Sequence, residues 1–476
     1  MKIKILFLAM CASIISSCSK DDDKTTEEVN LEKPVYAEKT VAETKVDMEN
    51  TGIKMVNELK AMNQDQGVKA TVNLLELMNI GTGVNGSIKN SAYFQVMAAV
   101  KNISSNNPDA NVIFKSLKAE TSNSLELEAE FDKIAGVYTY NYTKNDFDFA
   151  ANASSGQVVF KFPASIASKK AKNNDGKLVI SKPKFVTGNF TLVDTKEMPS
   201  ELKYELSVDG TVVSSFSFTA SYTDEGLPSN VEGKLTLGAF ELKLTYGYKE
   251  TEVTVNYSFT HGSTTILDLG GTAGGKFTKA AIDNAQETKT IKDTSSYTYY
   301  NYETGQYETI QNIYEYKETE TFPERVLYNA NAHFQFMDMK IVGQIDFANF
   351  MKEYRKIEEN KYSAYIDSAV SMINKNMALV VVYASDNKAV AKAEAYAKNE
   401  KYDEYNCTWD ANTWEYNCST VQKTRKVIDV QMVFADGSKS SMETYFNQGF
   451  DNLITSFNSF IDDLNKTYNW KINHIN

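Results

Sequence analysis

Residues 234–248 read KLTLGAFELKLTYGY, and this stretch decides the fold. Leu235 and Leu237 alternate with polar residues, and Leu242 and Leu244 repeat the alternation a few positions later. Successive side chains of a β-strand point to opposite faces, so a period of two predicts strands with one apolar and one polar face. The stretch therefore predicts consecutive strands of an antiparallel sheet.

The same pattern extends on both sides of this stretch, from about residue 111 to residue 270. It returns in SLELEAEF, LKYELSVDG, VVSSFSFTASY and EVTVNYSF. Asp175–Gly176 and Asp209–Gly210 are short turn signals between such strands. Consecutive strands with short connections predict an antiparallel meander, whose apolar face needs a cover.

Residues 45–104 have mostly helical spacing. Apolar residues recur every three or four positions in two groups, which are Ile53, Val56, Leu59 and Met62, and then Val68, Val72, Leu75 and Met78. Gly67 lies between the groups and is expected to break them, and residues 87–102 form a third, less regular stretch. These helices are expected to pack on one face of the sheet.

The second half of the chain uses the same kinds of element. Residues 332–345 and 378–384 read as strands, and Asp346 can cap a helix that continues to about residue 373. Residues 389–398 alternate alanine with larger side chains, which fits either an alanine-rich helix or a strand whose small face lets a helix approach. We predict the strand.

Residues 441–468 give the clearest helical pattern. The apolar positions are Phe446, Phe450, Leu453, Phe457, Phe460 and Leu464, spaced 4, 3, 4, 3 and 4 residues apart. Such a stripe can meet a partner protein or a lipid, but it more often faces a core. We expect it to cover the strands just before it.

The sequence thus predicts an α+β fold with large antiparallel β-meander sheets covered by helices. Its expected parts are a removed leader at residues 1–17, a disordered tether at 18–44, helices and a meander at 45–282, and a second β/helix unit at 283–476. The element order is similar to that of lipoprotein carriers of the LolA type. This analogy implies a curved sheet wrapped around helices.

Cys407 and Cys418 lie in EYNCTWDANTWEYNC, which is almost symmetric about Asn412. Pairing the two cysteines also sets Trp409 opposite Tyr416 and leaves a four-residue loop, a common hairpin length. An oxidising compartment permits a disulfide here, which is expected to contribute roughly 2 to 3 kcal/mol. A redox or metal pair is the alternative, but it lacks a C-x-x-C spacing.

The stretch SSYTYYNYETGQYETIQNIYEY at residues 295–316 is the best binding candidate. A turn at Thr304–Gly305 is expected to set Tyr302 opposite Tyr307, with Tyr300 on the same face. Exposed rings there can stack on a glycan or a protein partner. The alternative is a hairpin that cross-strand aromatic pairs merely stabilise, by up to roughly 1 kcal/mol.

Other motifs for catalysis or cofactors fail on particular residues. Gly270, Gly275 and Lys276 match most of a phosphate loop, but Phe277 stands where a Ser or Thr must hold Mg²⁺. The three histidines, His261, His333 and His474, are far apart in the sequence, and no G-x-S-x-G motif occurs. We predict no catalytic residue, metal site or cofactor, although a pair of hydrolase carboxylates would be invisible among 62 acidic residues.

The N-terminus contains the parts of an export signal. Lys2 and Lys4 precede an apolar run at residues 5–15, which is too short to span a bilayer. The next four-residue box, Ile15-Ser16-Ser17-Cys18, resembles the lipobox of bacterial lipoproteins. The resemblance implies cleavage before Cys18 and acylation of that cysteine, which anchors the chain in a membrane.

The residues after Cys18 extend this resemblance. They are Ser19, Lys20, Asp21, Asp22 and Asp23. This segment is similar to the acidic export signal of surface lipoproteins of the Bacteroidota, which implies an outer-membrane position facing the cell exterior. The alternative is that the aspartates belong only to a solvated linker.

The net charge of the chain limits which classes of partner it can bind. Removal of residues 1–17 takes Lys2 and Lys4 from the 50 basic residues, which leaves 48 against 62 acidic residues and a formal charge of −14. Nucleic acid is disfavoured as a partner, because phosphate binding needs a basic face. We expect a surface lipoprotein with a binding or structural role toward a glycan, protein or apolar ligand. The alternatives are a carrier of a hydrophobic ligand and a hydrolase.

Overall fold

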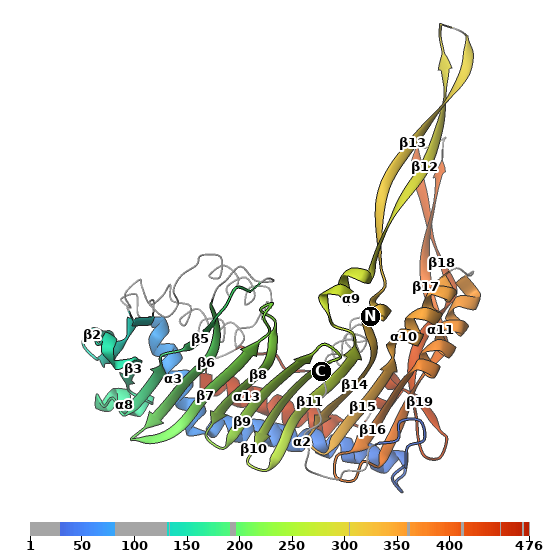
Figure 1. Ribbon diagram of the computed structural model, residues 1–476. Helices are drawn as coiled ribbons and strands as arrows, with labels where there is room; N and C mark the ends of the chain where they lie inside the picture. The colour runs from blue at the N-terminus through green and yellow to red at the C-terminus, as the bar shows by residue number, and fades with distance from the viewer. Residues whose placement is uncertain are drawn as a thin grey trace.

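A computed structural model describes residues 29–475 except for 81–130, 133, 191–196, 304, 359–361, 411–413, 448 and 469–470. In the described residues, one sheet has 17 strands, a second has two, and eight α-helices accompany them (Figure 1). The chain is therefore rich in β-structure with helices, as its sequence predicts. Cys18, the predicted export signal at 19–23 and the predicted helix at 87–102 lie outside the described residues.

The strands of the large sheet fall on both sides of a two-stranded insertion. They are β1 Gly136–Asn141, β2 Asp146–Ala151, β3 Gln157–Phe162, β4 Gly176–Ser181, β5 Lys184–Thr187, β6 Glu197–Val208, β7 Thr211–Tyr222, β8 Pro228–Leu237, β9 Phe240–Lys249, β10 Glu252–His261, β11 Thr264–Gly275, β14 Leu327–Phe336, β15 Met339–Asp346, β16 Met377–Tyr383, β17 Ala389–Asp410, β18 Glu415–Val433 and β19 Lys439–Ser441. The insertion is β12 Gln286–Asn301 and β13 Gln306–Thr321. The helices are α2 Val41–Gln64, α3 Gln66–Ile80, α8 Ile166–Ala171, α9 Lys279–Asn284, α10 Phe347–Glu358, α11 Tyr362–Asn376, α12 Met442–Phe446 and α13 Asp451–Tyr468.

Backbone pairing orders the large sheet from β2 at one edge to β19 at the other. The order is β2, β1, β3, β4 with β5, then β6 to β11, and then β14 to β19. Every pairing is antiparallel except that of β1 with β3, so the predicted antiparallel sheet is in fact mixed. The reason is local: β2 folds back along one side of β1, and residues 152–156 then carry the chain to the other side.

One apolar face runs across the strands. Leu235 pairs with Leu242, Leu242 with Phe259, Phe259 with Leu267, and Leu267 with Phe336. Directly paired residues point to the same face, so this row continues one apolar surface from β8 to β14. The stretch KLTLGAFELKLTYGY thus forms the neighbouring strands β8 and β9. The large sheet also contains strands from both sides of residue 282, because β11 pairs with β14.

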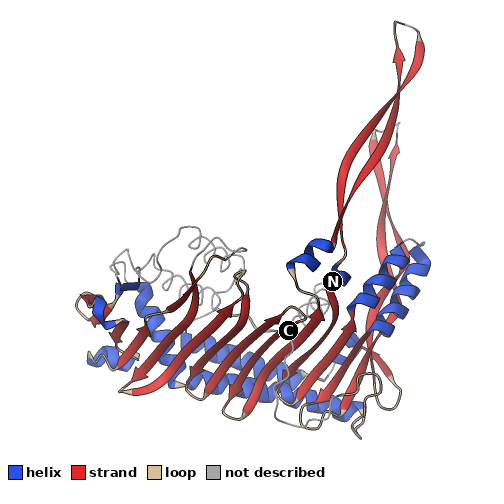
Figure 2. Ribbon diagram, viewed as in Figure 1, coloured by secondary structure: helices blue, strands red, loops and turns tan. Residues whose placement is uncertain are grey.

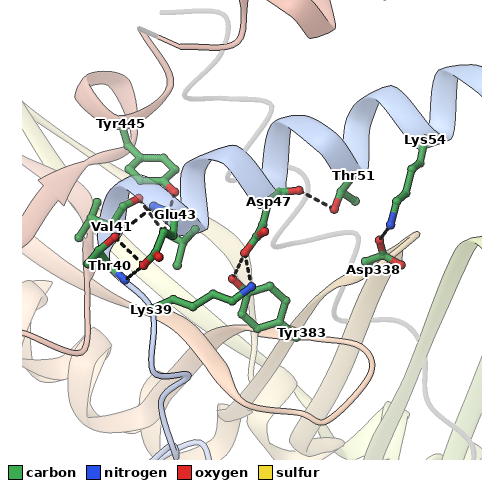
Figure 3. Close-up of polar contacts among 11 residues, drawn as sticks. Lys39, Thr40, Val41, Glu43, Asp47, Thr51, Lys54, Asp338, Tyr383 and Tyr445 are labelled. Atoms are coloured by element: carbon green, nitrogen blue, oxygen red, sulfur yellow. Dashed lines mark hydrogen bonds and ion pairs between the residues drawn. The ribbon is translucent and has the colours of Figure 1, made fainter.

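Helix α2 crosses the ends of the strands where several turns lie. Three of its polar contacts reach strand ends or turns of the large sheet. In chain order they are Asp47 to Tyr383 at 2.5 Å, Lys54 to Asp338 at 2.5 Å, and Glu58 to His261 at 2.6 Å (Figure 3 shows the first two). Tyr383 ends β16, Asp338 lies between β14 and β15, and His261 ends β10. A helix of 24 residues is about 36 Å long, which matches roughly seven spacings between neighbouring strands. The helix is thus long enough to meet each of these ends in turn.

Helix boundaries differ from the prediction at several places. Helix α2 begins at Val41, inside the predicted tether at 18–44, because the Thr40 side chain caps it there. The break between α2 and α3 lies at Asp65 and not at Gly67, because the Asp65 carboxylate accepts the Gly67 N–H at 2.7 Å and so caps α3. The predicted helix at 441–468 is two helices, α12 and α13. Gly449 lies between them with φ of 83°, a left-handed conformation that favours glycine and interrupts the helix.

The alanine-alternating segment is confirmed as the start of strand β17. Ala389, Ala391 and Ala395 are buried there, and helix α11 packs against β17. The Asn374 side chain of α11 donates to the Ala395 carbonyl and accepts the Ala395 N–H, both at 2.8 Å. Asn374 thus supplies the donor and the acceptor that a neighbouring strand would give to Ala395, at the point where β17 extends past the end of β16.

Candidate functional site

Two long hairpins leave the sheet and extend away from it on the same side (Figures 1 and 2). The first, which we call the tyrosine arm, is β12 with β13, residues 286–321. The second, the disulfide arm, is residues 396–429, the part of β17 and β18 that pairs only with itself. A strand of 15 or 16 residues is about 50 Å long, so each tip lies far from the sheet.

The tip of the tyrosine arm carries the three tyrosines that the sequence singles out. The ring centroid of Tyr300 lies 5.2 Å from that of Tyr302 and 5.2 Å from that of Tyr307. Tyr302 is 92% exposed and Tyr307 is 75% exposed. On the same tip, the hydrogen bond from Tyr299 to Glu308 raises the pKa of the Tyr299 hydroxyl. The three rings form one exposed cluster.

The predicted register at this tip is wrong by two residues on one strand. Tyr307 pairs with Tyr300 and not with Tyr302. The loop is longer than a two-residue turn, because the Gly305 N–H donates to the Asn301 carbonyl at 2.8 Å and closes the hairpin there. Gly305 has φ of 68°, which its lack of a Cβ permits. Tyr302 is therefore part of the loop, where it has its high exposure.

The tip of the disulfide arm carries a second aromatic cluster. Cys407 and Cys418 are bonded, with an S–S distance of 2.07 Å, and Trp409 pairs with Tyr416, as the sequence predicts. The Trp409 ring lies 4.9 Å from the Tyr416 ring and 6.1 Å from that of Trp414. Trp414 is 78% exposed and Tyr416 is 68% exposed. The sequence predicts the hairpin, but it gives no local signal that these rings gather in one exposed cluster.

The base of the tyrosine arm is fixed to α10 through Arg355. Its guanidinium bonds Glu320 at 2.7 Å and Glu324 at 3.0 Å, and it lies 4.4 Å from the centroid of the Phe322 ring. Glu320 belongs to β13, and Phe322 and Glu324 lie just after the end of this strand. The two carboxylates, with Glu324 the stronger contributor, raise the pKa of Arg355. The arm is thus held to the helix by charge-assisted hydrogen bonds.

The base of the disulfide arm is fixed to α11. Asn374 bonds the backbone of Ala395, and Lys426 of β18 pairs with Asp367 at 2.6 Å. The two helices in turn contact each other, because Glu353 of α10 accepts from Lys375 at 2.5 Å. The helical hairpin α10–α11 therefore connects the bases of both arms, and we call it the brace.

A small apolar cavity lies between α11 and the large sheet. Its volume is about 120 Å³. Its walls are mostly small or apolar side chains, among them Ala330, Ala332, Gly343, Ile373, Leu379 and Ala393. The cavity exists because its wall on β14, β15 and β17 consists mostly of alanine and glycine. The next residue pair on the same face of β14 and β15 is larger, phenylalanine with isoleucine.

The histidines occupy three separate places. Their nearest carboxylates are Glu58 for His261 at 2.6 Å, Asp268 for His333 at 2.8 Å, and Asp462 for His474 at 2.8 Å. Within the described ranges, no group of three His, Cys, Asp or Glu side chains is arranged to hold a metal ion. The glycine-rich run from Gly270 to Gly275 is the end of strand β11.

Among the helices that the structure describes, none combines the length and the apolar character needed to cross a bilayer. The exposed aromatic clusters at the arm tips are the candidate site, because large rings are exposed together at each tip. Comparisons of the chain with models of protein families, with curated proteins and with solved structures find no match.

Proposed function

We propose that this protein is a lipid-anchored binding protein on the exterior of the outer membrane, and that the two arms carry its binding surface. The box Ile15-Ser16-Ser17-Cys18 and the acidic segment after it support the anchor and its outward address. The observation that carries the binding role is the exposed aromatic cluster at the end of each arm. Tyrosine and tryptophan are the side chains that most often dominate binding energy at interfaces.

The arms need more than their own hydrogen bonds to persist. An isolated two-stranded hairpin is marginally stable in water. The disulfide arm is closed by the Cys407–Cys418 bond near its tip, and the tyrosine arm is tied at its base through Arg355. These supports hold the aromatic tips in defined positions, which lowers the entropy lost when a partner binds.

We further propose that helices cover one face of the large sheet and that the sheet curves around them, as in the LolA-type analogy. The contacts of α2 support this arrangement. Met48 packs in a cluster with Met339, Ala391 and Tyr445, and Met55 packs near the buried Phe240. In this account the covered sheet is the scaffold, and the arms extend from it toward the partner.

Site-specific photo-crosslinking on intact cells tests the binding role. A benzophenone amino acid in place of Tyr302 or Trp414 is expected to yield discrete crosslinked products, because these side chains would lie in the interface. The matched control is Tyr328 on β14, which is 42% exposed but is not on an arm. Crosslinks that are absent from the tips, or equally abundant at Tyr328, would contradict the proposal.

The cavity favours a second candidate function, a carrier of an apolar chain. An apolar cavity of about 120 Å³ is close in size to engineered apolar cavities that bind benzene. It is smaller than the several hundred Å³ that suit a whole lipid, so only part of an alkyl chain would enter. Octanoate is the simplest probe of this chemistry.

The carrier interpretation predicts opposite effects of ligand and mutation at this cavity. Octanoate is expected to raise the melting temperature of the wild-type protein, because it binds only the folded state. Ala332→Leu should fill the space, stabilise the protein by about 1 kcal/mol and remove the octanoate effect. Differential scanning fluorimetry measures both. An octanoate shift that persists in Ala332→Leu would show that the ligand binds elsewhere.

A further inference from the structure

We infer that the two arm tips form a clamp for a positively charged, arginine-bearing protein surface. This inference rests on the proposed function and names the class of partner for the same site. It is carried by the charge at the tips, by the exposed rings, and by the way this chain pairs its own arginines.

The outer part of each arm carries only negative charge. Residues 293–316 of the tyrosine arm contain Asp293, Glu303, Glu308 and Glu315 and no Lys or Arg. Residues 402–422 of the disulfide arm contain Asp403, Glu404, Asp410 and Glu415 and no Lys or Arg. Two of these eight carboxylates are paired with lysines that lie just outside these ranges, Glu315 with Lys292 and Glu404 with Lys423. The other three on each arm leave both tips net negative, so the tips repel an anionic glycan or an anionic membrane and attract a basic surface.

The chain shows which cation suits this combination of rings and carboxylates. It has three arginines, Arg325, Arg355 and Arg425, and all three lie on an arm or beside its base. Each lies over an aromatic ring, at 4.1 Å and 4.4 Å for the two over Phe322 and at 5.1 Å for the one over Tyr402.

Each of these arginines also pairs with a glutamate. The partners are Glu287 for Arg325 at 2.5 Å, Glu320 for Arg355 at 2.7 Å, and Glu400 for Arg425 at 2.9 Å. A planar guanidinium can stack on a ring and bond a carboxylate at once, which an ammonium does less well. An aromatic ring, a carboxylate and an arginine thus occur together three times on the arms or beside their bases, and we call this combination the repeated unit.

The tips repeat two of the three parts of this unit. Tyr302 lies next to Glu303 in one loop, and on the other arm Tyr405 lies two residues from the exposed Asp403, on the same face of β17; both tyrosines are exposed. The sequence supplies no arginine at either tip, so the third part has to come from a partner. A partner that contacts both tips must span two arms, which points to a protein surface and not to a small cation.

The brace makes the two tips act together. Because α10 and α11 connect the bases, both arms extend from one support, and a partner that is large enough to reach both tips can bind the second tip while it is held at the first. The second contact is then intramolecular, which raises the overall affinity without any new contact. Removing the aromatic rings of both tips should therefore weaken binding more than removing those of one.

The test uses labelled nona-arginine and nona-lysine peptides with the full mature lipoprotein in neutral detergent. Wild-type protein is expected to bind nona-arginine about fivefold more tightly than nona-lysine, because two or more rings each add a cation–π contact. The double variant Tyr302→Leu, Trp414→Leu should lose this preference. Glu303→Gln with Asp403→Asn should weaken both peptides, whereas the matched pair Asp224→Asn, Glu225→Gln in the β7–β8 turn should weaken neither.

Two results would overturn the inference. One is equal affinity for the two peptides, or a preference for arginine that the leucine variants leave unchanged. The other is saturable binding of neutral maltoheptaose together with no preference between the peptides, which would make the partner a glycan. Neither result changes the outcome expected in the crosslinking experiment. The proposed class of partner and the proposed binding role of the arms can therefore be refuted separately.

Discussion

Cys18→Ala is expected to move the protein from the membrane fraction to the soluble fraction of disrupted cells. A lipobox cysteine carries several acyl chains, and each buried methylene contributes about 0.8 kcal/mol, so one substitution removes the whole anchor. The expected effect is nearly complete, which makes it the largest of those predicted here.

Fractionation followed by immunoblotting measures this release. Cys11→Ala is the matched control, because Cys11 lies in the apolar run that is removed with the leader. It should leave the protein in the membrane fraction. If Cys18→Ala also stays there, the lipoprotein assignment is wrong.

Phe162→Ala is expected to lower the free energy of unfolding by about 3 to 5 kcal/mol. Phe162 is fully buried in β3, in a cluster with Phe131 and Leu178. Gly176 on the neighbouring strand lies so close that a Cβ there would come within 2.9 Å of the Phe162 ring. The truncated side chain therefore leaves a cavity that its neighbours cannot easily close.

Urea unfolding followed by tryptophan fluorescence and circular dichroism measures the loss. Phe149→Ala is the control of identical chemistry, because Phe149 is 37% exposed in the edge strand β2. Its loss should be about half or less, since less apolar area returns to water. Equal losses for the two variants would mean that this end of the sheet lacks the core described above.

Strand pairing was predictable wherever apolar alternation and a short turn coincide. The stretch KLTLGAFELKLTYGY forms β8 and β9, and the Cys407–Cys418 disulfide and the Trp409–Tyr416 pair follow the predicted register. In both cases one face of the hairpin is chemically different from the other. A shift of one residue would exchange the faces, so the pattern fixes the register.

The arms themselves were not predictable as arms. In β12 and β13 nearly every position is exposed, so neither face carries an apolar stripe that would place the hairpin inside or outside the large sheet. The register at Tyr307 was missed because the loop closes through Asn301 and Gly305, a four-residue geometry that T-G alone does not specify. The brace depends on Arg355 and Glu320, which are 35 residues apart and give no local signal.

The predicted helix boundaries were wrong because periodicity alone does not locate the end of a helix. Gly67 is a plausible breaker by composition, but the capping side chain of Asp65 decides where α3 begins. The apolar stripe at 441–468 continues through Gly449 without a change of period, yet the backbone leaves the helix there. Periodicity reports which side faces the core, and it is blind to a short interruption that keeps the same side inward.

Labelling of arm tips on intact cells tests the central claim most directly. Cys407 and Cys418 are bonded to each other and Cys18 is expected to be acylated, so an introduced cysteine is the one reactive thiol of the mature chain. We expect Tyr302→Cys to react with a membrane-impermeant maleimide on intact cells, and Tyr138→Cys, which replaces a buried residue, to remain unlabelled. If Tyr302→Cys reacts only after the outer membrane is disrupted, the tips do not face the exterior and the account is wrong.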